Sequence, residues 1–226
     1  MLESPAMDVS WILDDLNEPQ RQAVTAPLGP LRVLAGAGSG KTRVLTRRIA
    51  WLLAVENASP WSILAVTFTN KAAAEMRGRV EAMLDHPIGG LWIGTFHGIA
   101  HRLLRQHWQE ARLPRAFQIL DSDDQTRLLK RVLRGLNLDE KKWPPPQVAG
   151  FINRCKDEGQ RPADLADDGK PVQRRYREIY TIYQQECERV GLVDFGELLL
   201  RVFELVARQS GLVDPLPGAV PACVGG

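Results

Sequence analysis

The sequence predicts an α/β fold in its first half and a helical subdomain in its second half. The first observation is a set of three short apolar runs, typical of buried strands, at residues 31–35, 63–68 and 91–96. The second is that each run precedes a segment with apolar residues at helical spacing, namely 42–55, 71–84 and 97–108. Strands that alternate with helices in this way predict a parallel sheet with crossover helices.

The second half carries little strand signal, and only residues 117–120 are a candidate strand there. Asp121 or Ser122 is expected to cap the first helix of this half, and Asp194 the last. Two further helices are expected at 147–156 and 172–190. The inner face of the first helix is expected to hold Leu128, Leu129, Val132 and Leu133. The apolar pattern of the last helix consists of Leu198, Leu199, Val202, Phe203 and Val206.

These patterns divide the chain into three expected parts. Residues 1–109 would form the first part of an α/β domain, and residues 110–209 a helical insertion subdomain. The tail at 210–226 holds four glycines, three prolines and one charged residue. This composition is typical of irregular or disordered chain.

Composition excludes several classes of protein. The chain has 226 residues, of which 44% are hydrophobic and 25% charged, as in soluble globular proteins. It has no run of 18 apolar residues, so a membrane partner is not expected. The N-terminus is acidic before its first base, Arg21, which argues against a secretory signal. Its cysteines, Cys155, Cys187 and Cys223, have no metal-site or disulfide spacing, so we expect a cytoplasmic location.

Charge is distributed unevenly along the chain. Residues 1–30 carry a net charge of −4, residues 31–131 of +7, and residues 132–226 of −1. A basic middle segment favours an anionic partner. The alternative is a solvated surface that is rich in arginine.

A glycine-rich segment, Ala-Gly-Ala-Gly-Ser-Gly-Lys-Thr at 35–42, joins the first predicted strand to the first predicted helix. In this context it predicts a phosphate-binding P-loop, because glycines let successive backbone N–H groups close on phosphate oxygens at a helix N-terminus. Lys41 would reach the β and γ phosphates, and the Thr42 hydroxyl would bind Mg²⁺. Ala35 departs from the strict pattern, which has glycine there. The alternative is a glycine-rich turn followed by a chance Lys-Thr.

Four further segments resemble motifs of superfamily 1 helicases of the UvrD/Rep/PcrA type. Leu-Asn-Glu-Pro-Gln-Arg-Gln-Ala-Val at 16–24 resembles the Q motif. Residues 65–76 and 94–98 resemble motifs Ia and Ib, and residues 191–199 resemble the segment that precedes the Walker B strand. The likeness covers about residues 7–209.

This resemblance implies the N-terminal portion of an ATP-dependent DNA helicase with a P-loop NTPase (RecA-like) parallel sheet. The implied ligands are ATP, Mg²⁺, single-stranded DNA and duplex-junction DNA, and the implied partners include DNA repair proteins. Lys41 and Thr42 would be catalytic, and the Gln20 amide would select adenine unless it is an ordinary surface residue. The expected nucleotide-binding residues are Gln20, Ala35, Gly36, Ala37, Gly38, Ser39, Gly40, Lys41, Thr42 and Arg43.

The segments at 65–76 and 94–98 suit single-stranded DNA on physical grounds too. Both follow predicted parallel strands, whose carboxyl ends bind ligands. Each offers an aromatic ring, Phe68 or Phe96, on which a base could stack without sequence preference. The alternatives are that Phe68 is a core residue and that His97 caps a helix. The expected DNA-binding residues are Thr67, Phe68, Thr69, Asn70, Lys71, Thr95, Phe96, His97 and Gly98.

A catalytic Asp-Glu pair after a buried strand is not found in the sequence. The pairs at 139–140 and 157–158 do not follow a predicted strand and are expected to be solvated. ATP hydrolysis needs such carboxylates, so we expect this chain alone to be inactive. The second hypothesis is therefore a module that binds ATP and single-stranded DNA without turnover. A P-loop ATPase of another kind would leave 65–76 and 94–98 unexplained.

The same omission predicts marginal stability. The resemblance implies that the strand with the Asp-Glu pair would lie beside the run at 31–35. Without that strand, the run would expose an apolar edge to water. We therefore expect the isolated chain to be marginally stable or prone to association.

Overall fold

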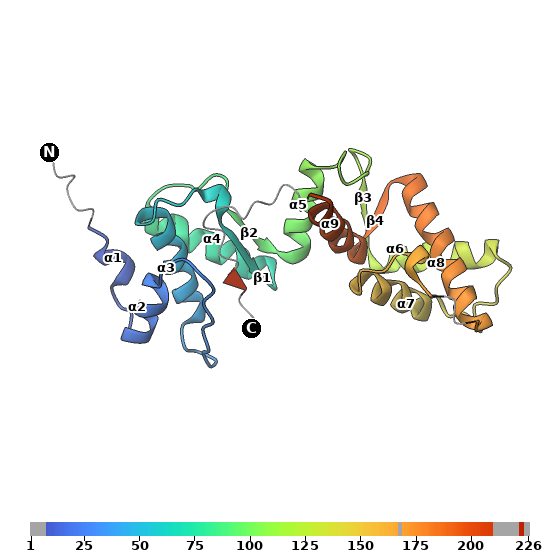
Figure 1. Cartoon of the computed structure of the whole chain (residues 1–226), viewed down its shortest axis with the longest axis horizontal. Helices are drawn as coiled ribbons and strands as arrows, with labels where there is room; N and C mark the ends of the chain where they lie inside the picture. Colours follow the sequence, from blue (N-terminus) through green and yellow to red (C-terminus); the bar gives the residue numbers. More distant parts are fainter. Residues whose placement is uncertain (1–7, 167–168, 210–221, 224–226) are drawn as a thin grey trace. The chain divides into compact units, whose positions relative to one another are not determined.

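The computed structural model describes residues 8–166, 169–209 and 222–223 (Figure 1). The described residues divide into two compact units, the first formed by residues 8–99 with 222–223 and the second by residues 100–166 with 169–209. Helix α5 (Phe96–Gln106) begins in the first unit and continues into the second. This division falls about ten residues before the expected seam near 110, and the three expected parts stay a prediction.

The first unit contains a parallel sheet with the strand order β2-β1-β5. Its strands are β1 (Leu64–Thr67), β2 (Trp92–Thr95) and β5 (Ala222–Cys223). The structure thus confirms the strands predicted at 63–68 and 91–96 and their parallel pairing. The pairing aligns Thr67 with Thr95, so both strands end at the same level.

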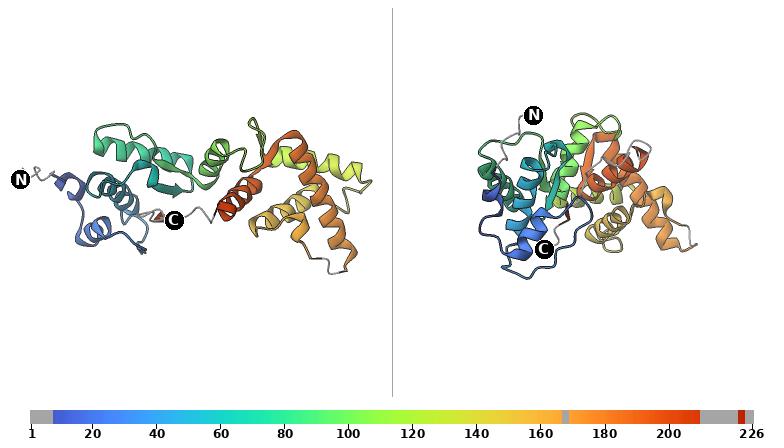
Figure 2. Two further views of the ribbon diagram at one scale, coloured as in Figure 1. Left: turned by 45° about the horizontal axis from the view of Figure 1, so that its top comes forward. Right: turned by 60° about the vertical axis from the view of Figure 1, so that its left-hand side comes forward.

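Two helices pack beside each other and against these strands: α3 (Lys41–Ala54) and α4 (Asn70–Leu84) (Figure 2). Both match predicted helices. Their core is apolar and includes Ile49 from α3, Met76 and Val80 from α4, and Ala65 from β1. A 3-10 turn, η1 (Pro60–Ser62), precedes β1.

Two short helices that the sequence analysis did not predict precede the glycine-rich loop. They are α1 (Ser10–Leu13) and α2 (Glu18–Thr25). Ile12 of α1, Leu16 between the two helices and Val24 of α2 are buried and form a small core against α3. The segment that resembles the Q motif therefore lies mostly on α2, the helix that precedes the glycine-rich loop.

The strand predicted at 31–35 is wrong. Residues 30–36 have no regular secondary structure. Leu31, Val33 and Leu34 are 50%, 47% and 79% exposed. A strand needs hydrogen-bonded neighbours, and no strand in the described part of the chain pairs with this segment. These apolar side chains are exposed, but without a strand there is no exposed strand edge, and the expected marginal stability stays a prediction.

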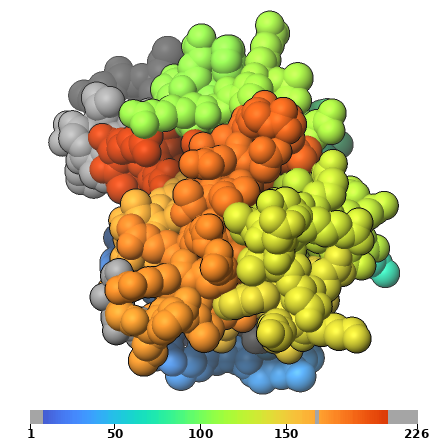
Figure 3. Space-filling model, turned by 90° about the vertical axis from the view of Figure 1, so that its right-hand side faces the viewer, coloured from blue at the N-terminus to red at the C-terminus, as the bar shows by residue number. Residues whose placement is uncertain are grey.

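The second unit is mainly helical, with the four expected helices in place. They are α6 (Ser122–Gly135), α7 (Pro145–Asp157), α8 (Pro171–Val190) and α9 (Phe195–Gln209), with a 3-10 turn η2 (Pro162–Asp164). Their core includes Leu129, Leu133, Ile152, Tyr180 and Tyr183. α6 and α8 lie side by side on one face of this unit (Figure 3).

An all-helical second unit was predicted, and this is wrong in one respect. β3 (Gln118–Leu120) pairs in parallel with β4 (Leu192–Asp194). β3 matches the candidate strand at 117–120. β4 was missed because three residues between two helices are too few to show a period of two.

The apolar pattern predicted for α9 is also partly wrong. Phe203 and Val206 are 65% and 47% exposed. Leu198 of the predicted pattern is buried, but the buried face also carries the charged residues Glu197 and Arg201. A search for apolar residues at helical spacing does not find a buried face that contains ion pairs. The expected irregular tail lies outside the described residues, except for β5.

Candidate functional site

The glycine-rich loop has the backbone conformation that a phosphate loop requires. Gly38 and Gly40 have φ values of +74° and +81°, in the left-handed region that favours glycine. Gly40 is the N-cap residue of α3, so the loop leads directly into a helix of 14 residues. The loop closes on itself, because the Ser39 N–H and hydroxyl both donate to the Gly36 carbonyl, at 3.3 and 2.7 Å.

The Lys41 side chain folds back over this loop. Its ammonium donates to the carbonyls of Ala35 and Gly36, at 3.0 and 3.1 Å. Thr42 follows it in the first turn of α3 and is exposed. The two predicted catalytic residues thus lie where the loop meets the helix, with Ala37 exposed on the loop beside them.

Gln20 contacts the same loop from α2. Its Nε2 donates to the Ser39 carbonyl at 3.0 Å, and its Oε1 accepts from the Asn17 N–H at 3.1 Å. The Asn17 side chain in turn accepts from the Gln20 N–H at 3.0 Å, which completes a capping box. The structure therefore brings Gln20 and the loop together. Asn17 was missed, although Asn-x-x-Gln at a helix start is the sequence signal of this box.

Three arginines of α3 hold the N-terminal segment in place through its carbonyls. Arg43 donates to the Asp15 carbonyl at 3.3 Å, Arg47 to that of Trp11, and Arg48 to that of Val24 at 2.7 Å. Arg43, predicted to bind nucleotide, is thus engaged with the segment that precedes Gln20. These contacts fix α2 relative to α3.

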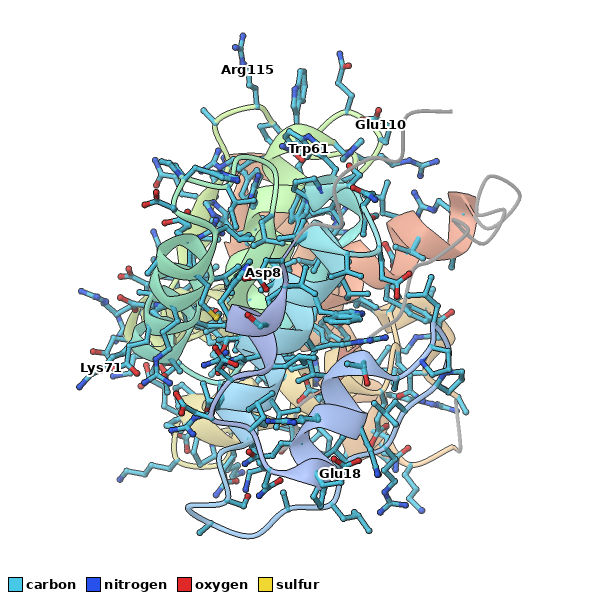
Figure 4. The ribbon with its side chains drawn as sticks, turned by 90° about the vertical axis from the view of Figure 1, so that its left-hand side faces the viewer. Asp8, Glu18, Trp61, Lys71, Glu110 and Arg115 are labelled. Atoms are coloured by element: carbon cyan, nitrogen blue, oxygen red, sulfur yellow. The ribbon has the colours of Figure 1, made fainter. Side chains whose placement is uncertain are left out.

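The segments at 67–71 and 95–98, here called the two aromatic loops, lie at the same edge of the first sheet. Phe68 and Phe96 come directly after the paired residues Thr67 and Thr95. They are 70% and 50% exposed, so the alternative that Phe68 is a core residue is wrong. Lys71, in the first turn of α4, is exposed and extends outward (Figure 4).

The polar residues of these loops start the helices that follow. The Thr69 hydroxyl accepts from the Ala72 N–H at 3.1 Å and caps α4. The Thr95 hydroxyl accepts from the Gly98 N–H at 3.1 Å. Thr95, and not His97, therefore caps the start of α5. Thr95 also donates to Asn70 Oδ1 at 3.5 Å, which links the two loops.

Comparison with known proteins decides the family. Residues 16–218 match the protein family described as UvrD/REP helicase N-terminal domain. The chain belongs to the UvrD/REP helicase family. It is 61% identical to DNA helicase II of Escherichia coli K12 over 199 residues, which are 88% of this chain and 28% of that protein.

Other relatives of this UvrD/REP chain show the same coverage. It is 59% identical over 207 residues to DNA helicase II of Haemophilus influenzae, and 41% identical over 204 residues to the ATP-dependent DNA helicase PcrA of Bacillus subtilis. Each match covers 90% of this chain and 28% of the relative. The predicted resemblance to UvrD/Rep/PcrA helicases is confirmed, and the chain spans 28% of the length of these relatives.

The segment of the UvrD/REP domain at 191–199 builds a buried ionic cluster, which the sequence analysis missed. Lys156 Nζ lies 2.7 Å from Asp194 Oδ2 and 3.0 Å from Glu197 Oε2. Glu197 also accepts from Arg161 at 2.8 Å and from Arg201 at 2.6 Å. Burial alone would raise the pKa of Glu197, but Lys156, Arg161 and Arg201 together lower it. Asp194 caps α9 as predicted, because its Oδ1 accepts from the Glu197 N–H at 2.8 Å.

These buried charges fix the fold of the second unit. The cluster joins α7, β4 and α9 through named side-chain contacts. Tyr183 on α8 extends it, since its hydroxyl donates to Asp194 Oδ2 at 2.7 Å. Burial, followed by the charge of Asp194, raises the pKa of Tyr183. The carboxylates are satisfied by cations and donors of the chain, so the cluster is structural.

The described ranges of this UvrD/REP domain contain neither a metal cluster nor a membrane-spanning helix. No group of three or more His, Cys, Asp or Glu residues there could hold a metal ion. None of the helices that the structure describes combines the length and the apolar character needed to cross a bilayer.

Proposed function

We propose that this chain is the ATP-binding portion of an ATP-dependent DNA helicase with a P-loop NTPase (RecA-like) fold. The observation that carries the proposal is the junction of three predicted elements. The left-handed glycines at 38 and 40, the Lys41 ammonium and the Gln20 amide meet at the start of α3. Family membership adds weight, because the relatives include proteins named ATP-dependent DNA helicase PcrA.

The residues of the loop fit a triphosphate. A side chain added at Gly36 or Gly38 would meet no described atom within 4 Å, which leaves space above the backbone. The N–H groups of the first turn of α3 and its dipole favour phosphate oxygens there. In this proposal, Lys41 exchanges its two carbonyl acceptors for phosphate oxygens, and the Thr42 hydroxyl holds Mg²⁺. The metal would neutralise charge on the phosphates.

The edge formed by the two aromatic loops fits single-stranded DNA. Phe68 and Phe96 are exposed at the ends of adjacent strands, and stacking on such rings tolerates any base. We propose that Thr67, Thr69, Asn70, Lys71, Thr95, His97 and Gly98 contact the backbone or bases beside these rings. Unwinding at duplex junctions, DNA repair partners and a cytoplasmic location belong to the same proposal for the whole helicase.

A second function is favoured by the position of the acidic pairs. Glu140 lies in a turn, and Asp157 and Glu158 are exposed at the end of α7. Neither pair follows a strand. The alternative function is therefore a module that binds ATP and single-stranded DNA and does not hydrolyse ATP. The 226-residue polypeptide can be tested for this directly.

The test is binding of a fluorescent ATP analogue to the unaltered chain, to Lys41→Ala and to Lys130→Ala. Lys130 is exposed on α6 and serves as the control for loss of one positive charge. We expect Lys41→Ala to abolish most of the affinity and Lys130→Ala to keep it. Unchanged binding by Lys41→Ala would refute the phosphate site. Single-turnover ATPase measurements with and without oligo-dT then separate the two functions, since DNA-stimulated turnover excludes the binding module.

A further inference from the structure

The Gln20 amide is oriented at both ends by backbone groups of the chain. Its oxygen accepts from the Asn17 N–H at 3.1 Å, and its nitrogen donates to the Ser39 carbonyl at 3.0 Å. Rotating the amide by half a turn would place two donors together at one end and two acceptors at the other, and both contacts would be lost. One orientation is therefore fixed.

The packing around this amide is close. A Cβ atom at Gly40 would lie 3.0 Å from Gln20 Nε2, so a larger residue would press on the amide. Gly40 also has a left-handed φ of +81°, which favours glycine for a second reason. The Gln20 nitrogen is thus seated against the N-cap residue of α3.

A fixed amide has hydrogen-bonding capacity left on each end. After the two backbone contacts, Oε1 keeps one lone pair and Nε2 keeps one N–H. Adenine presents a donor at its 6-amino group beside the acceptor N7, which matches this pair. Guanine presents two acceptors, O6 and N7, and the Gln20 oxygen would then face an acceptor. The orientation of the amide therefore decides which purine is favoured.

We propose that Asn17 is a positioning residue for adenine selection, acting through Gln20. Its side chain caps α2 by accepting from the Gln20 N–H at 3.0 Å, and this places its own N–H opposite Gln20 Oε1. Without that cap, the first turn of α2 loosens and the amide loses its fixed orientation. The inference rests on the proposed ATP site and assigns a role there to Asn17.

The experiment compares fluorescent ATP and GTP analogues that carry the same fluorophore, on the full chain and four variants. Asn17→Ala removes the cap, and Asn17→Asp keeps an acceptor at the same place. Asn17→Gly also lacks the side chain but disturbs a helix start less than alanine does. Asp121→Ala is the matched control, because Asp121 caps α6 in the other unit by accepting from the Asp124 N–H at 2.8 Å.

We expect Asn17→Ala and Asn17→Gly to weaken binding of the ATP analogue, about fivefold for alanine, the equivalent of one helix cap. Binding of the GTP analogue should not change, Asn17→Asp should restore the preference, and Asp121→Ala should leave it intact. An equal loss for both analogues in the alanine and glycine variants would overturn the role of Asn17, as would an unchanged preference. Failure of the unaltered chain to bind either analogue would refute the ATP site itself.

Discussion

Replacing Lys156 by methionine would remove a buried positive charge while nearly keeping its volume. Lys156 is 3% exposed, and its ammonium contacts Asp194 Oδ2 at 2.7 Å and Glu197 Oε2 at 3.0 Å. Burial alone would lower the pKa of Lys156, but Glu197 and Asp194 raise it, so this residue is charged in the folded protein. The substitution therefore leaves two buried carboxylates with one cation fewer.

The free-energy cost follows from the partners that stay. Removing one member of a buried ion pair destabilises a protein by about 3–5 kcal/mol. Glu197 keeps Arg161 and Arg201, and Asp194 keeps the Tyr183 hydroxyl and a backbone N–H. We therefore expect the lower end of the range, about 3 kcal/mol. In urea this loss lowers the unfolding midpoint by roughly 1–3 M.

Far-UV circular dichroism in urea measures this midpoint, and an exposed ion pair supplies the control. Arg175 and Glu178 are in contact at 2.6 Å, but their side chains are 42% and 44% exposed. Arg175→Met should therefore cost at most about 1 kcal/mol. Equal midpoints for Lys156→Met and Arg175→Met would refute the conclusion that the buried cluster holds the second unit together.

Two further predictions concern DNA and pH. Phe68→Ala should weaken oligo-dT binding by about 1–3 kcal/mol, measured by fluorescence anisotropy at fixed salt. The control Phe203→Ala, which removes an exposed ring of α9, should not weaken it. Equal affinities of these two variants for oligo-dT would refute the stacking role of Phe68. His101 accepts a hydrogen bond from Arg105 Nε at 3.0 Å, and burial followed by the charge of Arg105 lowers its pKa from 6.5. As the pH falls, His101 therefore becomes protonated in the unfolded chain before it does so in the folded chain. The contribution of neutral His101 to the free energy of unfolding is complete above about pH 6.5 and is lost as the pH falls. When urea unfolding midpoints are measured at several pH values, the midpoint of His101→Gln should fall less on acidification than that of the unaltered chain. Equal falls in the two proteins would contradict this reasoning.

Local signals in the sequence were enough to predict most helices and the parallel pair β1 and β2 of the first sheet. Asp121 was expected to cap α6, and its Oδ1 accepts from the Asp124 N–H at 2.8 Å. The predicted inner face of α6 is also confirmed, because Leu128, Leu129, Val132 and Leu133 are all buried. Such features depend on residues within one or two turns of each other, so the sequence itself contains the interaction.

The errors concern features that depend on distant parts of the chain. β4 exists because Leu192–Asp194 pairs with β3, more than seventy residues earlier. The segment at 31–35 has the residues of a buried strand, but a strand forms only where another strand pairs with it. The buried face of α9 was misjudged because Glu197 and Arg201 become core residues only beside Lys156 and Arg161.

The candidate site shows the same division between local and distant signals. The loops after β1 and β2 were expected at one edge because parallel strands end together, and the alignment of Thr67 with Thr95 confirms this. The contact between Gln20 and Ser39 spans two elements, α2 and the loop before α3, and no spacing rule predicts it. Resemblance to a family can suggest that Gln20 and the loop share a ligand, whereas the hydrogen bonds show how the amide is oriented. The specificity of a site can therefore depend on a residue such as Asn17, which need not touch the ligand.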